Sequence, residues 1–327
     1  MRNPTSNVIF ITGLLTGFFC LHFLLGSNSI KGKRGHFIQS DHHRAAAKNQ
    51  TPADQSNGTI RILCWIMTMP KYLETRTQHV RATWAKHCDR VLYMSSTSTD
   101  FPTVGLNVSE GRENLYWKTI RAFQFLQQHH MHDMDWFLKA DDDTFVVVEN
   151  LRHALSRFDT EKPWYLGRRF SPFIRKGYMS GGAGYVLSKE AVRRFITGFQ
   201  TGKCTHFSEL EDMALGKCME TMEVELGDTR DEKGRQTFHP FPLDHYVIRT
   251  PPRRRPWYMI YDFYTPIEGP GCCSDLAISF HYIPPPQMYV LEYLTHHLRA
   301  YGYRHRYHPD DKTKSNTTEH VEVQSPT

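Results

Sequence analysis

The sequence predicts an α/β domain, with a sheet flanked by helices, behind a single N-terminal membrane anchor. The 327 residues are 39% hydrophobic and 13% aromatic, which is enough to bury a core and too apolar for a disordered chain. An uncharged apolar run stands near the N-terminus. Beyond it, a strand pattern over residues 60–66, a helix-like stretch over 74–87 and a second strand over 90–94 follow in the order that opens an α/β sheet.

The apolar run covers residues 8–26, carries no formal charge and is long enough to cross a bilayer. A cleaved signal peptide is the alternative, but the run is longer than a usual signal core and no small-residue cleavage site follows it directly. Arg2 is the only basic side chain before the span, whereas Lys31, Lys33 and Arg34 follow it. The positive-inside rule alone would therefore place the N-terminus outside. Other features must decide the side.

The anchor divides the chain into segments of different character. Residues 1–7 are expected to be a cytoplasmic tail, and residues 27–59 are polar without a hydrophobic period, as in a flexible stem. The folded, lumenal domain is expected over residues 60–308. Residues 309–327 are polar and are expected to be disordered.

Further helical and strand patterns follow within the expected domain. Spacing of apolar residues predicts a helix over residues 113–130, and a buried strand over 136–140 comes next. Two more helices are predicted over 149–158 and 190–201, and a helix-like segment covers 213–218. The alternation supports a sheet covered by helices.

The cysteines favour an oxidising compartment. Of seven cysteines, Cys20 lies in the apolar run, which leaves an even number beyond it. Pairs that are local in sequence are preferred, and the last two cysteines then form a vicinal bridge or stay free: Cys64 with Cys88, Cys204 with Cys218, then Cys272 and Cys273. Six reduced thiols are the alternative, and metal binding by cysteine is disfavoured because no C-x-x-C spacing occurs. Four glycosylation sequons give weak support for the lumen, at Asn49, Asn57, Asn107 and Asn316.

Charge and missing motifs exclude several classes of function. The net charge of +6 is spread along the chain, and its densest runs, at residues 31–34 and 253–255, are interpreted as membrane-flanking and surface segments. We therefore expect no nucleic-acid partner. The sequence has no P-loop and no convincing G-x-G-x-x-G, which argues against P-loop and dinucleotide-dependent enzymes.

Three consecutive carboxylates, Asp141, Asp142 and Asp143, come directly after the strand predicted over 136–140. This position is the carboxyl edge of a sheet, where open α/β folds bind ligands. Hard oxygen ligands there suit Mg²⁺ or Mn²⁺, which can neutralise a diphosphate leaving group. The alternative is an acidic turn that caps a helix after Thr144.

Several segments around this triplet occur in an order that resembles a known family. They are residues 110–119, 136–144, 167–170, 177–185, 211–212, 238–241, 268–275 and 279–282. Together they resemble the core 1 β1,3-galactosyltransferases, which add galactose to O-linked N-acetylgalactosamine (GalNAc). The most specific part is Gly-Pro-Gly-Cys-Cys-Ser-Asp, ending at Asp275, combined with Ser-Phe-His-Tyr, ending at Tyr282.

The resemblance implies a GT-A type fold with a central mixed sheet, a UDP-galactose donor, Mn²⁺ and inversion at the anomeric carbon. Asp141 and Asp143 would serve the ribose and the metal, and His281 would be a further metal ligand. A lone histidine is more often structural, so this assignment to His281 depends on the resemblance. The resemblance also implies a single-pass type II protein of the Golgi membrane, a homodimer, a GalNAc-bearing glycoprotein acceptor and a lumenal chaperone of the same family as a possible partner.

The resemblance places a further group of residues near the uridine and phosphates of the donor. They are Met67, Thr68, Glu110, Gly111, Arg112 and Lys118. For Arg112 and Lys118, positive charge beside a diphosphate is a direct reason. The alternative for these two residues is an exposed helix face.

An inverting transfer needs a base that takes the proton of the acceptor hydroxyl. Asp212 is our choice, with Glu211 as an alternative base or an acceptor-binding residue. Both could instead be ordinary carboxylates at a helix start. On the acceptor side, Gly181 and Gly182 would let the backbone approach the sugars, and Trp257 would stack on a sugar face. A tight turn and core packing are the respective alternatives.

Other functions remain open at this stage. One is a catalytically silent relative that chaperones an active transferase, and the intact triplet, Glu211, Asp212 and His281 argue against it. A Fringe-like β1,3-transferase with another donor is a second alternative, and the cysteine-containing motif over 268–275 argues against that. A lectin-like module is a more distant third.

Overall fold

The computed structural model describes residues 60–249 and 256–302. The expected cytoplasmic tail, anchor and stem, over residues 1–59, and the expected polar tail lie outside the described residues. Among the described residues, no helix has both the length and the apolar character needed to span a membrane.

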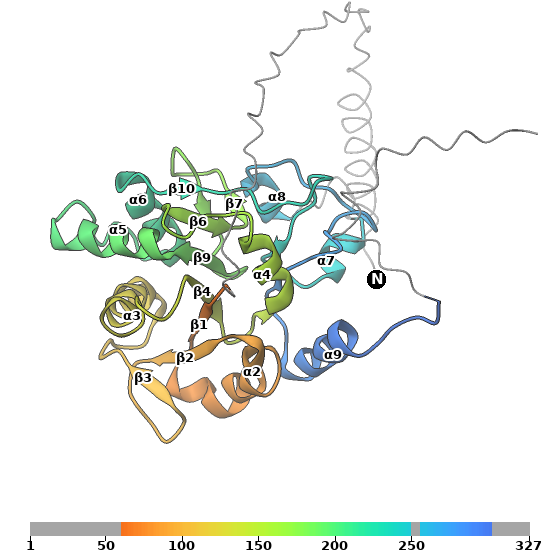
Figure 1. Cartoon of the computed structure of the whole chain (residues 1–327), viewed down its shortest axis with the longest axis horizontal. Coiled ribbons are helices and arrows are strands. Elements are labelled where there is room, and N and C mark those ends of the chain that lie inside the picture. Colours follow the sequence, from red (N-terminus) through yellow and green to blue (C-terminus); the bar gives the residue numbers. More distant parts are fainter. Residues whose placement is uncertain (1–59, 250–255, 303–327) are drawn as a thin grey trace, which may run out of the picture. The chain divides into compact units, whose positions relative to one another are not determined.

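A mixed sheet of seven strands forms the centre of the described domain, in the order β10-β6-β9-β4-β1-β2-β3 (Figure 1). Its strands are β1 Ile62–Met67, β2 Arg90–Ser95, β3 Thr103–Gly105, β4 Trp136–Asp141, β6 Trp164–Gly167, β9 Tyr185–Ser188 and β10 Glu225–Leu226. β1 pairs in parallel with β2 and β4, whereas β9 runs antiparallel to both β4 and β6. The expected α/β fold with a mixed central sheet is confirmed.

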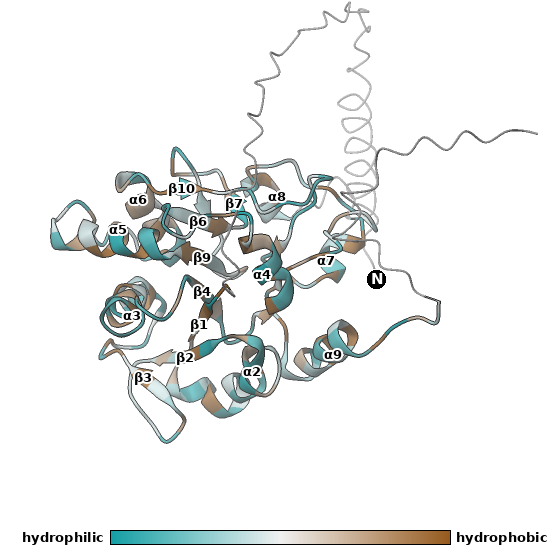
Figure 2. Ribbon diagram, viewed as in Figure 1, coloured by the Kyte–Doolittle hydropathy of each residue, from teal (hydrophilic) through white to brown (hydrophobic). Residues whose placement is uncertain are grey.

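Helices cover both faces of this sheet (Figure 1). On one face lie α3 Leu115–His129, α5 Lys189–Gln200 and α6 Glu211–Thr221, whose buried residues share a core with the sheet. On the other face lie α2 Gln78–Ala82, α4 Val148–Leu155 and α9 Pro285–His296. Leu63 and Trp65 of β1 point into the first core, and Ile62 and Cys64 point into the second. Because both faces are buried, the strand is a continuous apolar run, as the brown β1 of Figure 2 illustrates.

The predicted helices are present with shifted ends. The stretch predicted over residues 74–87 is helical but broken into a π-helical turn, Leu73–Thr77, then α2, then a 3₁₀ turn, Trp84–His87. The break falls at Thr83, whose ψ of −118° is far from helical values. The remaining short helices are α7 Asp244–Val247, α8 Trp257–Tyr261 and 3₁₀ turns Pro70–Tyr72 and Arg112–Asn114.

A three-stranded sheet, in the order β11-β12-β5, joins the second face of the domain. Its strands are β5 Phe145–Val146, β11 Phe238–His239 and β12 Ser279–Phe280. β12 runs antiparallel to β5, and β5 begins two residues after Asp143. This pairing brings a late segment of the chain next to the acidic triplet. A separate hairpin pairs β7 Arg169–Phe170 with β8 Tyr178–Met179.

Three disulfides close within the described domain, and the two local pairs predicted from the sequence are confirmed. Cys64–Cys88 joins β1 to the segment before β2, and Cys204–Cys218 joins the loop after α5 to α6. The neighbours Cys272 and Cys273 are also bonded, which selects the vicinal bridge over free thiols.

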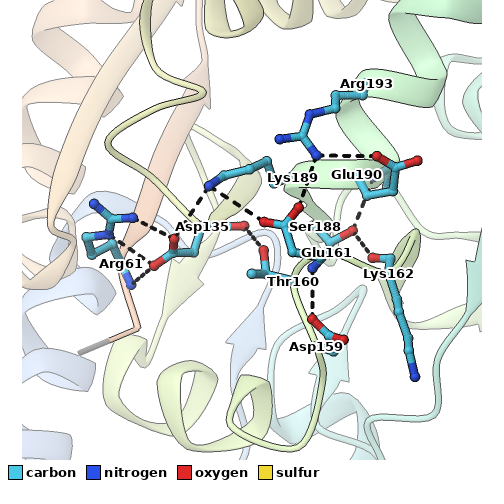
Figure 3. Close-up of polar contacts among 11 residues, drawn as sticks. Arg61, Asp135, Asp159, Thr160, Glu161, Lys162, Ser188, Lys189, Glu190 and Arg193 are labelled. Carbon is cyan, nitrogen blue, oxygen red and sulfur yellow. Dashed lines mark hydrogen bonds and ion pairs between the residues drawn. The ribbon is translucent and has the colours of Figure 1, made fainter. Parts of the chain in front are cut away.

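A polar network fastens the amino end of β4 (Figure 3). The Asp135 carboxylate accepts two hydrogen bonds from the Arg61 guanidinium, at 2.7 and 3.1 Å, and a third from the Arg61 amide. The Lys189 ammonium lies 3.9 Å from Asp135, and Thr160 Oγ1 donates to the Asp135 carbonyl at 2.6 Å. The start of β4 is thereby tied to the start of β1 and to α5.

Candidate active site

The acidic triplet lies at the carboxyl end of β4, as predicted. Asp141 is the last residue of β4 and is in register with Met67, the last residue of the parallel β1. The triplet does not cap a helix, so that alternative is wrong. Instead, the Asp141 carbonyl accepts from the Thr144 amide at 3.1 Å, and the chain then enters β5; α4 starts only at Val148.

His281 reaches the triplet through the pairing of β12 with β5. Its Nε2 lies 3.1 Å from Asp143 Oδ1 and 3.7 Å from Asp141 Oδ2. One ligand atom from each of the three residues lies within 4.8 Å of the others. Two carboxylates and one imidazole, none of them fully exposed, form a donor set that fits Mn²⁺. The three predicted metal ligands, which are far apart in sequence, therefore come together.

Asp142 and Asp143 differ in their surroundings although they are adjacent. Burial raises the pKa of Asp142 to about 6. The negative charges of its two neighbouring aspartates contribute to this rise, by more than the positive charge of Arg76 lowers the pKa. Burial alone would raise the pKa of Asp143 as well. The hydrogen bond and the charge of His281 outweigh this effect, and the pKa of Asp143 is lowered. Arg76 lies 3.3 Å from Asp142 Oδ1 and 3.1 Å from Asp143 Oδ2. No local pattern in the sequence singles out this arginine.

Lys139 is a second cation that the sequence analysis missed. Its side chain is buried, and its ammonium lies 2.7 Å from Asp141 Oδ1 and donates to the Gly181 carbonyl at 3.1 Å. Burial would lower the pKa of Lys139, but Asp141 and Glu211 outweigh it and raise that pKa. A lysine inside an otherwise apolar strand was the available signal, because a buried ammonium requires a partner.

The residues expected near the donor are arranged around the end of β1. Lys118 of α3 is buried, so the alternative of an exposed helix face is wrong for it. Its ammonium donates to the Thr68 carbonyl at 2.6 Å and lies 3.0 Å from Glu110 Oε2. Gly111 has a φ of 136°, a region that favours glycine, and Arg112 beyond it is exposed and reaches the cavity.

Glu211 and Asp212 begin α6, as predicted, and point into the site. Glu211 Oε1 accepts from the Thr119 hydroxyl at 2.8 Å and from the Tyr185 hydroxyl at 2.7 Å. Asp212 Oδ2 accepts from the Gly181 amide at 3.0 Å, and Oδ1 accepts from the Met213 amide at 2.8 Å. The two carboxylates are therefore held differently, Glu211 by hydroxyls deep in the core and Asp212 by backbone amides.

Burial raises the pKa of both carboxylates. For Asp212 the amides of Gly181 and Met213 offset part of the burial effect, and the pKa stays above its ordinary value. For Glu211 the nearby Lys139 ammonium offsets part of it, and that pKa is also raised. A carboxylate with a raised pKa is a stronger base once it is ionised, which suits proton abstraction.

Gly182 is needed because His281 lies against it. A Cβ placed on Gly182 would lie 2.3 Å from His281 Nδ1, closer than any side chain tolerates. A Cβ on Gly181 would lie 3.1 Å from Glu211 Oε2, a tight but less severe contact. The tight turn proposed as the alternative for these glycines is also present, because the Gly184 amide donates to the Gly181 carbonyl at 3.0 Å.

The site opens into a cavity of about 400 Å³. Of the predicted site residues, its wall includes Met67, Arg112, Asp141, Gly181, Gly182, Glu211, Asp212, Trp257 and His281. The other predicted residues do not line this cavity: Thr68, Glu110, Gly111, Lys118 and Asp143. Trp257 is 55% exposed, so core packing does not explain it, and its ring adjoins that of Phe241.

Several known proteins resemble this chain. A family model described as Fringe-like matches residues 59–232, more than half of the chain. The glycoprotein-N-acetylgalactosamine 3-beta-galactosyltransferase 1 of Xenopus laevis is 50% identical over 269 residues, which are 82% of this chain and 75% of the relative. The beta-1,3-glucosyltransferase of Mus musculus is 31% identical over 163 residues, 49% of this chain and 33% of the relative.

A solved structure of the galactosyltransferase LgtC, in complex with donor and acceptor sugar analogues, aligns at a TM-score of 0.41 and 11% identity over 68% of this chain and 87% of that chain. This likeness is too distant to inform the site. The family model and the Xenopus relative, by contrast, cover the segments that hold the triplet and Asp212. The chain therefore belongs to the Fringe-like family, and it is a glycosyltransferase of the core 1 β1,3-galactosyltransferase group that its motifs resemble.

Proposed function

We propose that this protein transfers galactose from UDP-galactose, in β1,3 linkage, to O-linked GalNAc on serine or threonine of glycoproteins, and so forms the core 1 O-glycan. The observation that carries this proposal is the convergence of Asp141, Asp143 and His281 in one donor set beside the cavity that Asp212 lines. The relative that is 50% identical over most of the chain is named as a galactosyltransferase that acts on glycoprotein N-acetylgalactosamine, and this supports the choice of sugars.

Mn²⁺ bound by Asp141, Asp143 and His281 would neutralise the diphosphate of the donor and stabilise it as a leaving group. Lys118, whose ammonium is buried against Glu110 and the Thr68 carbonyl, is suited to hold the end of β1 in place. Arg112 is exposed at the cavity and is the donor-side cation that is free to approach the phosphates.

Asp212 is the base in the proposed mechanism. It takes the proton of the acceptor 3-hydroxyl while that oxygen attacks the anomeric carbon of galactose. The bond from this carbon to the diphosphate oxygen breaks, and UDP leaves with the electron pair. Attack from the opposite side converts the α-linkage of the donor into a β-linkage. The Gly181 and Met213 amides fix the Asp212 carboxylate for this role.

Glu211 is better suited to positioning than to proton transfer, because one of its oxygens already accepts two hydroxyl donors in the core. Trp257 offers an exposed indole at the cavity, and such a ring can stack on the apolar face of GalNAc. These assignments place donor binding at the ends of β1 and β4 and acceptor binding between α6 and α8.

The wider setting belongs to the same proposal. We propose a GT-A type catalytic domain held in the Golgi membrane by residues 8–26, with type II topology and the catalytic domain in the lumen. The three disulfides are in keeping with that oxidising compartment. We further propose that the protein is a homodimer and that a lumenal chaperone of its own family assists its folding.

The test is a transfer assay with the full-length protein purified in detergent. It is incubated with Mn²⁺, a GalNAc-bearing peptide and one of three donors: UDP-galactose, UDP-glucose or UDP-GlcNAc. Transfer to the peptide from UDP-galactose alone is expected. Transfer from UDP-glucose alone would instead favour a function like that of the glucosyltransferase relative. No transfer from any donor by folded protein would favour a silent chaperone.

A further inference from the structure

A cluster of potential metal ligands lies outside the active site. His87 ends the 3₁₀ turn Trp84–His87, Glu149 lies in the first turn of α4, and His296 is the last residue of α9. One nitrogen of each imidazole and one oxygen of Glu149 lie within 4.8 Å of one another. None of these three residues contributes to the cavity of the active site. Three separate elements therefore converge on one point.

A second observation is that two buried polar atoms at this point are unsatisfied. Glu292, one turn before His296 in α9, is only 8% exposed. Its Oε2 and the Nε2 of His296 lie 3.7 Å apart, and neither finds a hydrogen-bond partner among the described residues. Leaving buried polar atoms unpaired is costly, so this pair favours a cation close to it.

The His87 imidazole lies between two carboxylates and stacks on the His296 ring, with ring centroids 4.3 Å apart, so binding of one ion by both rings requires one of them to turn out of this stack. The Nδ1 of His87 lies 3.0 Å from Glu149 Oε1, and its Nε2 lies 3.1 Å from Glu292 Oε1. A ligating imidazole typically directs one nitrogen to the metal and donates the other N–H to a carboxylate, which fixes its tautomer. Glu292 is itself held by the Lys86 ammonium at 2.7 Å. Glu292 is thus the carboxylate that would orient His87, whose Nδ1 stays available beside Glu149.

We propose that His87, Glu149 and His296 form a second divalent-metal site, of zinc type, that fastens α9 to the body of the domain. Two imidazoles and one carboxylate are the ligands that Zn²⁺ takes when a water completes its coordination. The active site has two carboxylates and one imidazole instead, and this ligand set favours Mn²⁺. The two sites therefore prefer different metal ions.

The fold gives this site a structural role. Only Met288 and Glu292 of α9 are buried, so the helix has a small apolar anchor of its own. The chain enters α9 soon after His281, and the Ile283 amide donates to the Asp143 carbonyl at 2.9 Å on the way. A metal that holds the end of α9 against α4 therefore stabilises the segment that follows a ligand of the active site.

The test uses full-length protein stripped with a chelator, then saturated with Mn²⁺ and UDP to occupy the active site, and titrated with ZnCl₂. Bound zinc is counted by elemental analysis after gel filtration, and the melting temperature is measured in parallel. Wild type is expected to retain one zinc per chain and to melt several degrees higher with zinc than without it. Glu149→Gln and His296→Ala are expected to lose both the zinc and the shift.

Glu149→Gln is the more informative variant, because the Glu149 side chain is 54% exposed and its replacement opens no core. The matched control is His132→Ala, which removes an exposed histidine outside the cluster and should keep the zinc. His281→Ala should also keep it. If wild type binds no zinc under these conditions, or if Glu149→Gln and His296→Ala bind as much as wild type, the proposed site does not exist.

Discussion

The carboxylates at the two ends of β4 lie in different electrostatic surroundings. At the amino end, burial would raise the pKa of Asp135, but the hydrogen bonds and charge of Arg61 outweigh it and lower that pKa. At the carboxyl end, burial raises the pKa of Asp142 to about 6 and also raises the pKa values of Glu211 and Asp212, whereas Asp143, which pairs with His281, has a lowered pKa. An ion pair therefore lies beside the amino end of β4, and a group of carboxylates from β4, the turn after it and α6 lies beside the carboxyl end.

This difference suits the amino end of β4 to stabilising the fold and the carboxyl end to binding a ligand. Paired charges at the amino end join β1, β4 and α5 and leave nothing for a ligand (Figure 3). At the carboxyl end lie five carboxylates; Arg76 contacts two of them, and Lys139 is occupied by Asp141 and the Gly181 carbonyl. An uncompensated cluster of this kind destabilises the metal-free fold and favours binding of a divalent cation. The comparison predicts that changes at the two ends affect different measurements.

The largest effect is expected from the metal ligands. Asp143→Ala and His281→Ala should each lower galactose transfer by roughly a thousandfold or more, because several kcal/mol of leaving-group stabilisation are lost. The measurement is the initial rate at saturating Mn²⁺, with circular dichroism to show that the fold persists. Rates near that of wild type in either variant would refute the assignment of the metal site.

The next effect concerns the base. Asp212→Asn keeps the size of the side chain but removes the basic oxygen, so the turnover number should fall by about 10²- to 10⁴-fold. UDP binding, measured by calorimetry, should be unchanged; if UDP binding is lost as well, Asp212 is not simply the base. Because the pKa of Asp212 is raised, the acid limb of the wild-type rate profile should lie at higher pH than an ordinary aspartate would give.

Much of the fold could be predicted from the sequence because its long elements have simple patterns. The strand β1 is a continuous apolar run, β4 is apolar apart from Lys139 and its last residue Asp141, and α3 has clear helical spacing. The short strands β6 and β9 were missed, since four residues are too few to show a period. The helix α9 was missed because Pro284, Pro285 and Pro286 obscure its start, although proline is tolerated in a first helical turn.

The site was predictable in its residue types and less so in its geometry. Asp141 and Asp143 follow from their position after a strand, but His281 could be placed there only through a resemblance, because pairing of two-residue strands brings it in. Lys139 and Arg76 were missed because their roles depend on contacts with the triplet across the fold. The buried state of Lys118 likewise follows from packing of α3 against β1, which no local pattern reveals.

A smaller effect, on stability alone, is expected at the amino end of β4. Asp135→Asn removes a paired charge and should lower the free energy of unfolding by about 1–2 kcal/mol, since Arg61 is partly exposed and screened by solvent. Transfer per folded molecule should not change. The pKa of Asp135 is lowered on folding, so the contribution is present above the unfolded pKa and lost as the pH falls through the folded pKa. Denaturant unfolding at pH 7 and pH 3 should therefore show a difference that shrinks in acid.

The smallest expected effect has the opposite sign and lies at the carboxyl end. The pKa of Asp142 is raised from 3.8 to about 6, so its ionised form disfavours the metal-free fold, and wild-type stability should fall as the pH rises from about 4 to 6. Asp142→Asn removes that charge while its amide oxygen can still accept from the Thr68 hydroxyl, which now donates at 2.8 Å. Loss of the Arg76 pair offsets part of the gain, which leaves about 1 kcal/mol at neutral pH.

This gain should be visible as a higher melting temperature of Asp142→Asn in chelator at pH 7.5, and it should vanish at pH 4, where wild-type Asp142 is protonated. Added Mn²⁺ should also reduce the gain, because a cation beside the triplet stabilises the wild-type carboxylate as well. Asp135→Asn provides the contrast, since Mn²⁺ should leave its loss of stability unchanged. A variant at Asp142 that is less stable than wild type at pH 7.5 without metal would mean that Arg76 already compensates this carboxylate, and the two ends of β4 would then differ less than their pKa shifts suggest.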